Sequence, residues 1–206
     1  MTHIPFGTIT IPAIWVAVPL ALLIASLFYG WMTRTKAGDW FWNGFLLYVL
    51  SWKLSYIAFH PKMFLHMPLS IAYFNGGTKG HFLALALLSC YLLFIASKKY
   101  PSIYKEAAPL FLLFFAGYEA LIQFIEQHVE VTLFHTGLLA GYLYVFSVLH
   151  KKKIALSAQI FIVMAMLEFL MVSLFRTVSI EEMLTFSWMG ITVLILSENK
   201  KEGQHT

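Results

Sequence analysis

The chain contains little charge and only one cysteine. Asp, Glu, Lys and Arg make up 12% of its 206 residues, against roughly 25% in a typical soluble domain. An internal disulfide is excluded because Cys90, which lies inside an apolar run, has no second cysteine to pair with. Although the net charge is +4, the basic residues form no tail or stripe of the kind that binds nucleic acid. They occur in short clusters between apolar runs, which is typical of contacts with anionic lipid.

Two familiar catalytic motifs are also absent. No serine lies in a Gly-x-Ser-x-Gly elbow, which argues against that class of serine hydrolase. The zinc-helix spacing, with histidines at i and i+4 and a glutamate between them, does not occur. The histidines at the ends of the apolar runs lie on three separate segments, at His60, His66, His81 and His135. The sequence therefore predicts neither a metal site nor a cofactor.

Apolar residues dominate the chain instead. Hydrophobic residues make up 60% of the sequence and aromatic residues 17%, and the mean hydropathy is +0.75. A soluble domain is roughly 45–50% apolar, so this composition indicates a membrane protein. The abundance of Trp and Tyr fits a bilayer protein, because these side chains prefer the headgroup level.

Seven apolar runs approach the length of about 20 residues that a membrane-spanning helix needs. We predict an all-α integral membrane protein with about seven transmembrane helices in a single domain over residues 1–206. Helices are expected because a helix satisfies its own backbone hydrogen bonds in lipid. The predicted spans cover residues 11–33, 40–59, 82–97, 107–125, 131–149, 154–175 and 183–197.

Lysine and arginine concentrate in alternate connections between these runs. The first, third and fifth connections and the C-terminal tail carry most of the basic residues: Arg34, Lys36, Lys98, Lys99, Lys105, Lys151, Lys152, Lys153, Lys200 and Lys201. Basic residues mark the cytoplasmic side of a membrane protein. The pattern therefore predicts an N-terminus outside and a C-terminus in the cytoplasm.

The longest connection, residues 59–80, lies between the second and third spans. It contains Pro61 and Pro68, and then an apolar stretch over residues 69–74 that is too short to cross a bilayer. We predict a re-entrant or interfacial segment there, before the third span, because irregular backbone at membrane depth must be covered by protein or line a wet cavity.

The end of this connection is polar and glycine-rich, with the sequence Asn-Gly-Gly-Thr-Lys-Gly-His over residues 75–81. Gly76 and Gly77 would let the backbone approach a ligand closely. The N-terminus of the third span would direct free N–H groups, beside Lys79, at a phosphate or an oxyanion. Histidine is the side chain whose ordinary pKa suits a general base near neutral pH, which makes His81 a candidate for that role. The plainer alternative is that this segment is only the polar end of a helix, with no catalytic or binding role.

Several other polar residues lie within the apolar runs. Lys53, near the outer end of the second span, either extends its ammonium group to the surface or binds an anion. Glu119 and Gln123 share a helix face at the i, i+4 spacing, and Glu126 follows on nearly the same face. Glu168 is similarly placed in the sixth span. Because a carboxylate within the bilayer is costly, we expect Glu119 and Glu168 to face the bundle interior or water, for function or for a bond to a neighbouring helix.

The order of these residues resembles the prolipoprotein diacylglyceryl transferase family. Residues 53–59 read Lys-Leu-Ser-Tyr-Ile-Ala-Phe, which is similar to the family's Arg-x-x-Tyr-x-x-Phe. The Gly-Gly-x-x-x-His element over residues 76–81 matches the family's most recognisable motif. Fainter similarities involve Gly117 with Glu126, and the Glu168-Phe169 pair.

The resemblance implies a bacterial enzyme of the cytoplasmic (inner) membrane with seven spans. It would transfer a diacylglyceryl group from phosphatidylglycerol to the cysteine of a lipoprotein precursor. His81 and Glu126 would be catalytic. The substrate-binding residues would be Lys53, Tyr56, Gly76, Gly77, Lys79, Tyr118, Glu119, Gln123 and Glu168.

The chain also differs from the family at positions that bind the lipid phosphate. The family has arginine where this chain has Tyr118 and Met171, and a guanidinium fork is hard to replace. The alternative is therefore a non-catalytic protein of the same fold that binds a lipid or an exported lipoprotein. A transporter is a weaker alternative, because paired broken helices are not evident in the sequence.

Overall fold

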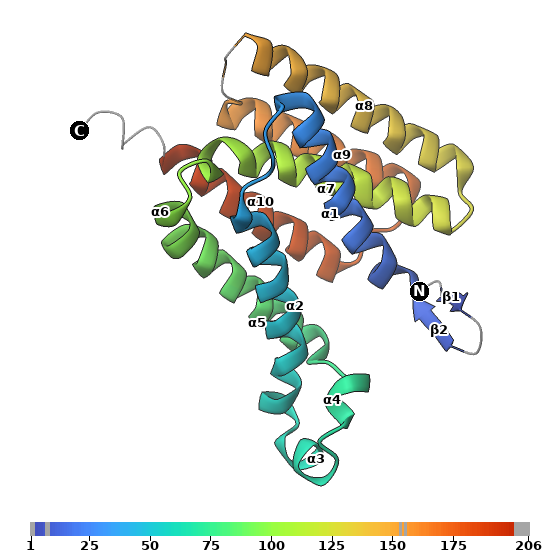
Figure 1. Cartoon of the computed structure of the whole chain (residues 1–206). Helices are drawn as coiled ribbons and strands as arrows, with labels where there is room; N and C mark the ends of the chain where they lie inside the picture. Colours follow the sequence, from blue (N-terminus) through green and yellow to red (C-terminus); the bar gives the residue numbers. More distant parts are fainter. Residues whose placement is uncertain (1–2, 7–8, 153, 155, 200–206) are drawn as a thin grey trace. The chain divides into compact units, whose positions relative to one another are not determined.

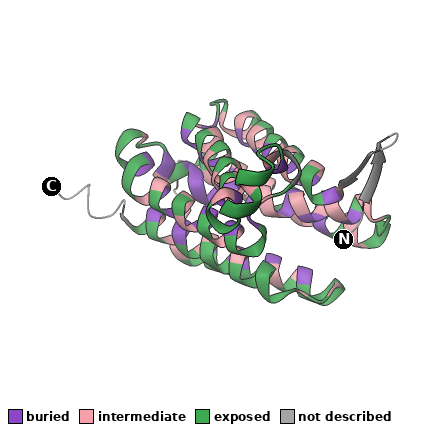
Figure 2. Ribbon diagram, turned by 90° about the horizontal axis from the view of Figure 1, so that it is seen from below, coloured by how far each residue is buried: buried purple, intermediate pink, exposed green. Residues whose placement is uncertain are grey.

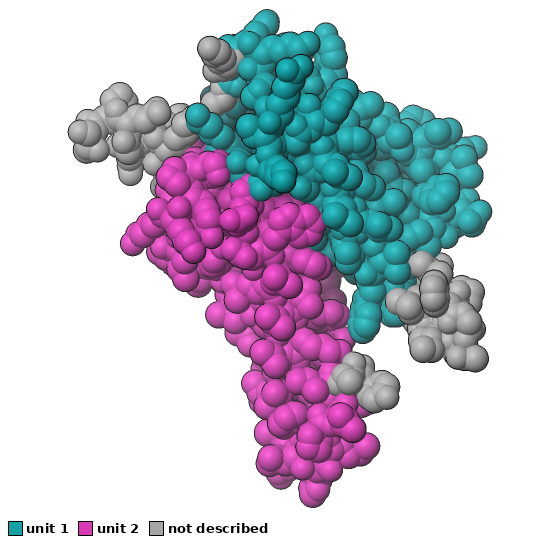
Figure 3. All heavy atoms as spheres, in the orientation of Figure 1, with its two compact units in different colours: residues 1–37, 105–178 teal, residues 38–104, 179–206 magenta. Residues whose placement is uncertain are grey.

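The structure is a computed structural model that describes residues 3–6, 9–152, 154 and 156–199. By its internal contacts the chain divides into two compact units, which Figure 3 shows in separate colours. Unit 1 contains residues 1–37 and 105–178, and unit 2 contains residues 38–104 and 179–206. The single domain expected from the sequence remains a prediction, and each unit is described by itself below.

Helices form nearly all of the described chain (Figure 1). They correspond to the seven predicted runs, with short additional helices and one N-terminal hairpin. In chain order the elements are β1 (His3–Phe6), β2 (Ile9–Pro12), α1 (Ala13–Thr33), α2 (Asp39–Phe59), α3 (Pro61–His66), α4 (Ser70–Tyr73), α5 (Gly77–Cys90), the π-helix η1 (Tyr91–Ala96), α6 (Ser97–Lys99), α7 (Ile103–Ile125), α8 (Val129–Lys151), α9 (Ala158–Phe175) and α10 (Ile180–Asn199).

Six stretches of helix in the described residues are long and apolar enough to cross a membrane, which makes the chain a multi-pass membrane protein. They are Ala13–Thr33, Gly77–Lys99, Ile103–Ile125, Val129–Lys151, Ala158–Phe175 and Ile180–Glu198. The remaining predicted span forms α2, which has 21 residues but is more polar because it contains Asp39, Asn43 and Lys53. Seven spans and their orientation remain predictions.

The outward surfaces of the helices fit a lipid environment. Figure 2 shows exposed positions along most helices, and many of them are large and apolar. Trp31 is 75% exposed, Leu27 68% and Leu133 67%. A soluble protein rarely exposes contiguous apolar surface on this scale, whereas lipid covers it.

Unit 1 contains the antiparallel β1–β2 hairpin, α1, most of α7, α8 and α9. Helix α1 buries an alanine on every turn, at Ala13, Ala17, Ala21 and Ala25. Small residues four positions apart let two helix backbones approach closely in a membrane. Within the unit, helix α1 contacts α8.

Unit 2 contains α2 to α6 and α10, with α2 and α5 in extensive contact. Polar side chains also join α5 to α10, since the Trp188 indole donates to Ser89 Oγ at 2.9 Å and Ser89 lies 3.0 Å from Thr192 Oγ1. The predicted re-entrant or interfacial segment forms the short helices α3 and α4.

The third predicted span begins five residues earlier than residue 82, because α5 starts at Gly77. The Asn75 side chain accepts a hydrogen bond from the Gly77 N–H at 2.9 Å, which satisfies one unpaired donor of the first turn. Gly77 has a φ of 58°, a backbone conformation that favours glycine. His81 therefore lies in the second turn of the helix rather than at its first residue.

Candidate functional site

His81 is held by side chains of two other helices in unit 2. Its Nδ1 atom lies 2.6 Å from the Tyr48 hydroxyl on α2. Its Nε2 atom lies 2.7 Å from Thr185 Oγ1 on α10. The Thr185 hydroxyl in turn donates to the Glu181 carbonyl oxygen at 2.7 Å. Both ring nitrogens of the half-buried histidine thus have partners.

The direction of these bonds fixes the protonation of a neutral His81. A hydroxyl has only one hydrogen to donate. Because Thr185 gives that hydrogen to the Glu181 carbonyl, its oxygen must accept from the His81 Nε2–H. Nδ1 then carries no proton and accepts from the Tyr48 hydroxyl. Such a histidine keeps one basic nitrogen, as a general base requires.

The first turn of α5 is fastened to its neighbours within unit 2. Thr78 donates to a Glu181 carboxylate oxygen on α10 at 3.1 Å, and the Trp52 indole donates to the Gly77 carbonyl at 3.3 Å. These bonds hold the first turn, directly before the turn that carries His81, in one position. Such rigidity suits a group that must act at a fixed geometry.

Gly76 and Gly80 pack directly against Ser55 of α2. A Cβ atom at Gly76 would lie 1.8 Å from Ser55 Oγ and 2.8 Å from the Gly80 Cα atom. A Cβ atom at Gly80 would lie 2.2 Å from Ser55 Oγ. Close helix packing is therefore a sufficient reason for glycine at position 76. Gly77 differs, since the space around its Cβ position is open and its positive φ is the constraint.

The other residues predicted for this part of the site lie around α2 and α5. Tyr56 is buried, its ring stacks on Phe74 with 5.8 Å between centroids, and its hydroxyl has no hydrogen-bond partner among the described residues. Lys53 is half-buried on α2, and Lys79 is exposed on α5. Of these three side chains, that of Lys79 is exposed and therefore accessible to an anionic ligand.

The predicted residues Glu119 and Glu168 lie in unit 1, within a buried polar cluster. Arg176, which ends α9, places Nη2 2.9 Å from Glu119 Oε1. His135 of α8 places Nδ1 3.5 Å from Glu168 Oε1. The side chains of Glu119, His135 and Glu168 are all 1% exposed or less. The expectation that these carboxylates face the bundle interior is therefore confirmed.

The remaining predicted residues lie on α7 or just after it. Gln123 is buried, with Oε1 2.9 Å from His128 Nδ1. Glu126 is half-buried, with a carboxylate oxygen 4.0 Å from the same nitrogen. Tyr118 packs among aromatic rings, with its centroid 6.3 Å from that of Phe114. None of these contacts by itself indicates a substrate.

The predicted site residues thus form two groups. His81, Lys53, Tyr56, Gly76, Gly77 and Lys79 belong to unit 2, whereas Tyr118, Glu119, Gln123, Glu126 and Glu168 belong to unit 1. Sequence reasoning missed Tyr48 and Thr185 as partners of His81. Thr185 lies four residues after Glu181, a usable helical spacing, but nothing in the local sequence of α2 distinguishes Tyr48.

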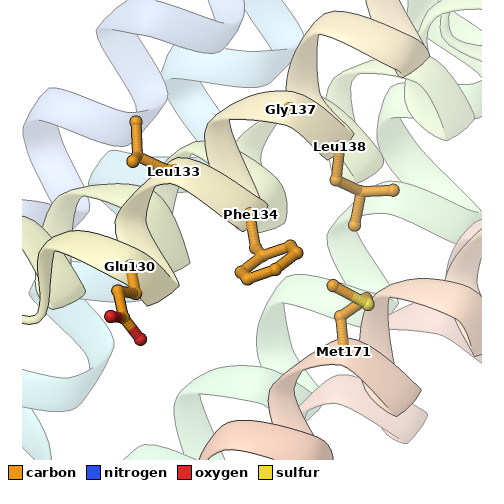
Figure 4. Close-up of a pocket in the computed structure, with 6 residues that line it drawn as sticks. All are labelled: Glu130, Leu133, Phe134, Gly137, Leu138 and Met171. Atoms are coloured by element: carbon orange, nitrogen blue, oxygen red, sulfur yellow. The ribbon is translucent and has the colours of Figure 1, made fainter.

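Unit 1 also has an open groove between α8 and α9, with a volume of about 530 Å³ (Figure 4). Phe134 and Leu138 on α8 face Met171 on α9 across it. The lining is apolar apart from Glu130. Among the described residues, no group of three or more His, Cys, Asp or Glu side chains is placed to hold a metal ion.

Comparisons of the chain with models of protein families, with curated proteins and with solved structures found no match.

Proposed function

We propose that the protein transfers a diacylglyceryl or related lipid group from a phospholipid to a lipoprotein-type acceptor at the outer leaflet. The observation that carries this proposal is the hydrogen-bond chain from Tyr48 through His81 to Thr185. It supplies a neutral imidazole with Nδ1 available as a base, in the second turn of a helix that starts at the Gly-Gly element. The family resemblance supplies the substrate class.

In the proposed step, a proton is relayed from the acceptor thiol through Tyr48 to His81, and a carbon–sulfur bond replaces a carbon–oxygen bond of the phospholipid. The acceptor thiol gives its proton to the Tyr48 oxygen as the Tyr48 hydroxyl proton passes to His81 Nδ1. The sulfur forms a bond to a glyceryl carbon of phosphatidylglycerol. The bond between that carbon and the phosphate oxygen breaks, and its electron pair leaves with glycerol phosphate. The imidazolium then returns its proton to water. Lys79 offers a positive charge for the departing phosphate.

The membrane topology that this proposal requires is the one predicted from the sequence. Seven spans including α2, with an outer N-terminus, place the start of α5 at the outer side of a bacterial cytoplasmic membrane. The short helices α3 and α4 before it would lie at the interface, and their exposed Met63, Leu65 and Leu69 support contact with lipid. Phosphatidylglycerol is the donor implied by the resemblance, and a lipoprotein precursor is the acceptor.

The test uses the purified full chain in nanodiscs that contain phosphatidylglycerol and a peptide with a lipobox cysteine. We expect the peptide to gain the mass of one diacylglyceryl group, and glycerol phosphate to be released in equal amount. Discs of phosphatidylethanolamine alone distinguish headgroup specificity. Failure of the wild-type chain to transfer, where an active family member succeeds, would overturn the proposal.

A non-catalytic lipid- or lipoprotein-binding protein is the second candidate function. Two observations favour it: both nitrogens of His81 are engaged, and helix packing accounts for Gly76. The same nanodisc experiment separates the two functions. Retention of the lipobox peptide without a change in its mass would support binding and exclude transfer.

A further inference from the structure

Four ionisable side chains of unit 1 lie at one level of its helices. Glu119 precedes the end of α7 by six residues, His135 follows the start of α8 by six, and Glu168 precedes the end of α9 by seven. At 1.5 Å per residue, each lies about 9–11 Å inside its helix end. Arg176, just beyond α9, is the fourth member of this layer of side chains, because it forms a hydrogen bond with Glu119.

The charges in this layer do not balance. Arg176 pairs with Glu119 and compensates one carboxylate. Glu168 is 0% exposed, and neither of its carboxylate oxygens has a hydrogen-bond partner among the described residues. His135 is 1% exposed, and neither of its ring nitrogens has one either. An ionised carboxylate in such a place is costly unless it is paired and hydrogen-bonded.

We propose that His135 and Glu168 together bind one exchangeable proton within the membrane. One proton neutralises the layer in either of two positions. On His135 it creates an imidazolium facing the Glu168 carboxylate at the observed 3.5 Å. On Glu168 it creates a neutral acid beside a neutral imidazole. Because the two groups are in direct contact, the proton belongs to the pair and not to either residue alone.

Among the described residues, several other charged or titratable groups lie near the pair. Glu119 of α7 interacts with both members of the pair and with Arg176 at the end of α9. Tyr142 of α8 lies near Glu168 and donates to the Met164 carbonyl at 2.7 Å. Tyr29 of helix α1 interacts with Glu106 of α7. Glu106 lies thirteen residues before Glu119, which is about 20 Å away along the helix.

The layer comes nearest to the surface of unit 1 at Arg176, whose side chain is 26% exposed, whereas its partner Glu119 is 1% exposed. Ionisable groups at this depth commonly form proton relays in membrane proteins. Loss of the proton leaves a negative charge between α8 and α9, which favours separation of these helices or entry of water. The site responds to pH independently of lipid transfer.

Infrared difference spectroscopy of the full chain in nanodiscs tests this proposal. Glutamate labelled with ¹³C and histidine labelled with ¹⁵N report whether one buried proton is lost as the pH rises. We expect this signal to disappear in Glu168→Gln, because Arg176 then compensates the remaining carboxylate of the layer. In His135→Gln we expect the labelled histidine to lose its part of the signal, while a protonated Glu168 carboxyl remains. Glu130→Gln and His150→Gln, which change exposed residues of α8, should retain it. A wild-type spectrum without this proton, or one in which sodium replaces it, would overturn the proposal.

Discussion

Replacement of His81 by glutamine is expected to reduce lipid transfer by about 10²–10⁴-fold, the usual contribution of a general base. Glutamine can still donate to Thr185 in the position of the Nε2–H. It has no basic nitrogen to accept the proton that Tyr48 passes on. The loss should therefore appear in kcat while the protein remains folded. The measurement is the rate of diacylglyceryl addition to the lipobox peptide in phosphatidylglycerol nanodiscs.

Two further variants make this result specific. His66→Gln changes an exposed histidine of α3 and should retain the wild-type rate. Tyr48→Phe removes the proton relay but leaves the imidazole, so its rate should lie between those of the wild type and His81→Gln. Equal rates for wild type and His81→Gln would show that transfer does not depend on this base.

Replacement of Gly76 by alanine is expected to destabilise unit 2 by about 3 kcal/mol, at the upper end of the usual cost of overpacking. The new methyl group would lie 1.8 Å from Ser55 Oγ and 2.8 Å from the Gly80 Cα atom. Rotation of the serine relieves only the first clash, and the backbone of α5 must move to relieve the second. Reversible unfolding in mixed detergent micelles measures the change in free energy.

Gly190→Ala is the matched control, because this glycine of α10 in the same unit has nothing within 4 Å of its Cβ position. There the alanine should stabilise the protein by roughly 0.5–1 kcal/mol, as in other helices. Combining Gly76→Ala with Ser55→Gly should recover part of the loss. If Gly76→Ala abolished transfer without changing stability, contact with the ligand rather than packing would explain this glycine.

Sequence reasoning located the helices well because apolar runs of this length have few alternatives in lipid. Each of the seven predicted runs contains a helix, although the first run begins in β2 and the sixth begins four residues before α9, with residue 155 outside the described residues. The start of α5 was the largest error, because Thr78, Lys79 and His81 are polar and resemble a loop. Asn75 and Gly77 explain this start: the Asn75 side chain accepts a hydrogen bond from the Gly77 N–H, and Gly77 adopts a positive φ where the helix begins.

The site was less predictable, because its contacts connect residues far apart in the chain. Tyr48 and Thr185 lie 33 and 104 residues from His81. Helical spacing identifies which residues share a face of one helix, but it does not reveal the partner helix. The Glu119 carboxylate was expected in the interior on the basis of cost alone. Its pairing with Arg176, beyond the end of another helix, required the structure.

The protonation of His81 tests the account most directly. Solid-state ¹⁵N NMR of histidine-labelled protein in phosphatidylglycerol bilayers, with the His81 signals assigned by their loss in His81→Gln, reports each ring nitrogen. The hydrogen-bond chain predicts a protonated Nε2 and an unprotonated Nδ1 that accepts from Tyr48, with the acceptor shift lost in Tyr48→Phe. A proton on Nδ1 in neutral His81 would contradict the account, because the site would then present no base toward Tyr48.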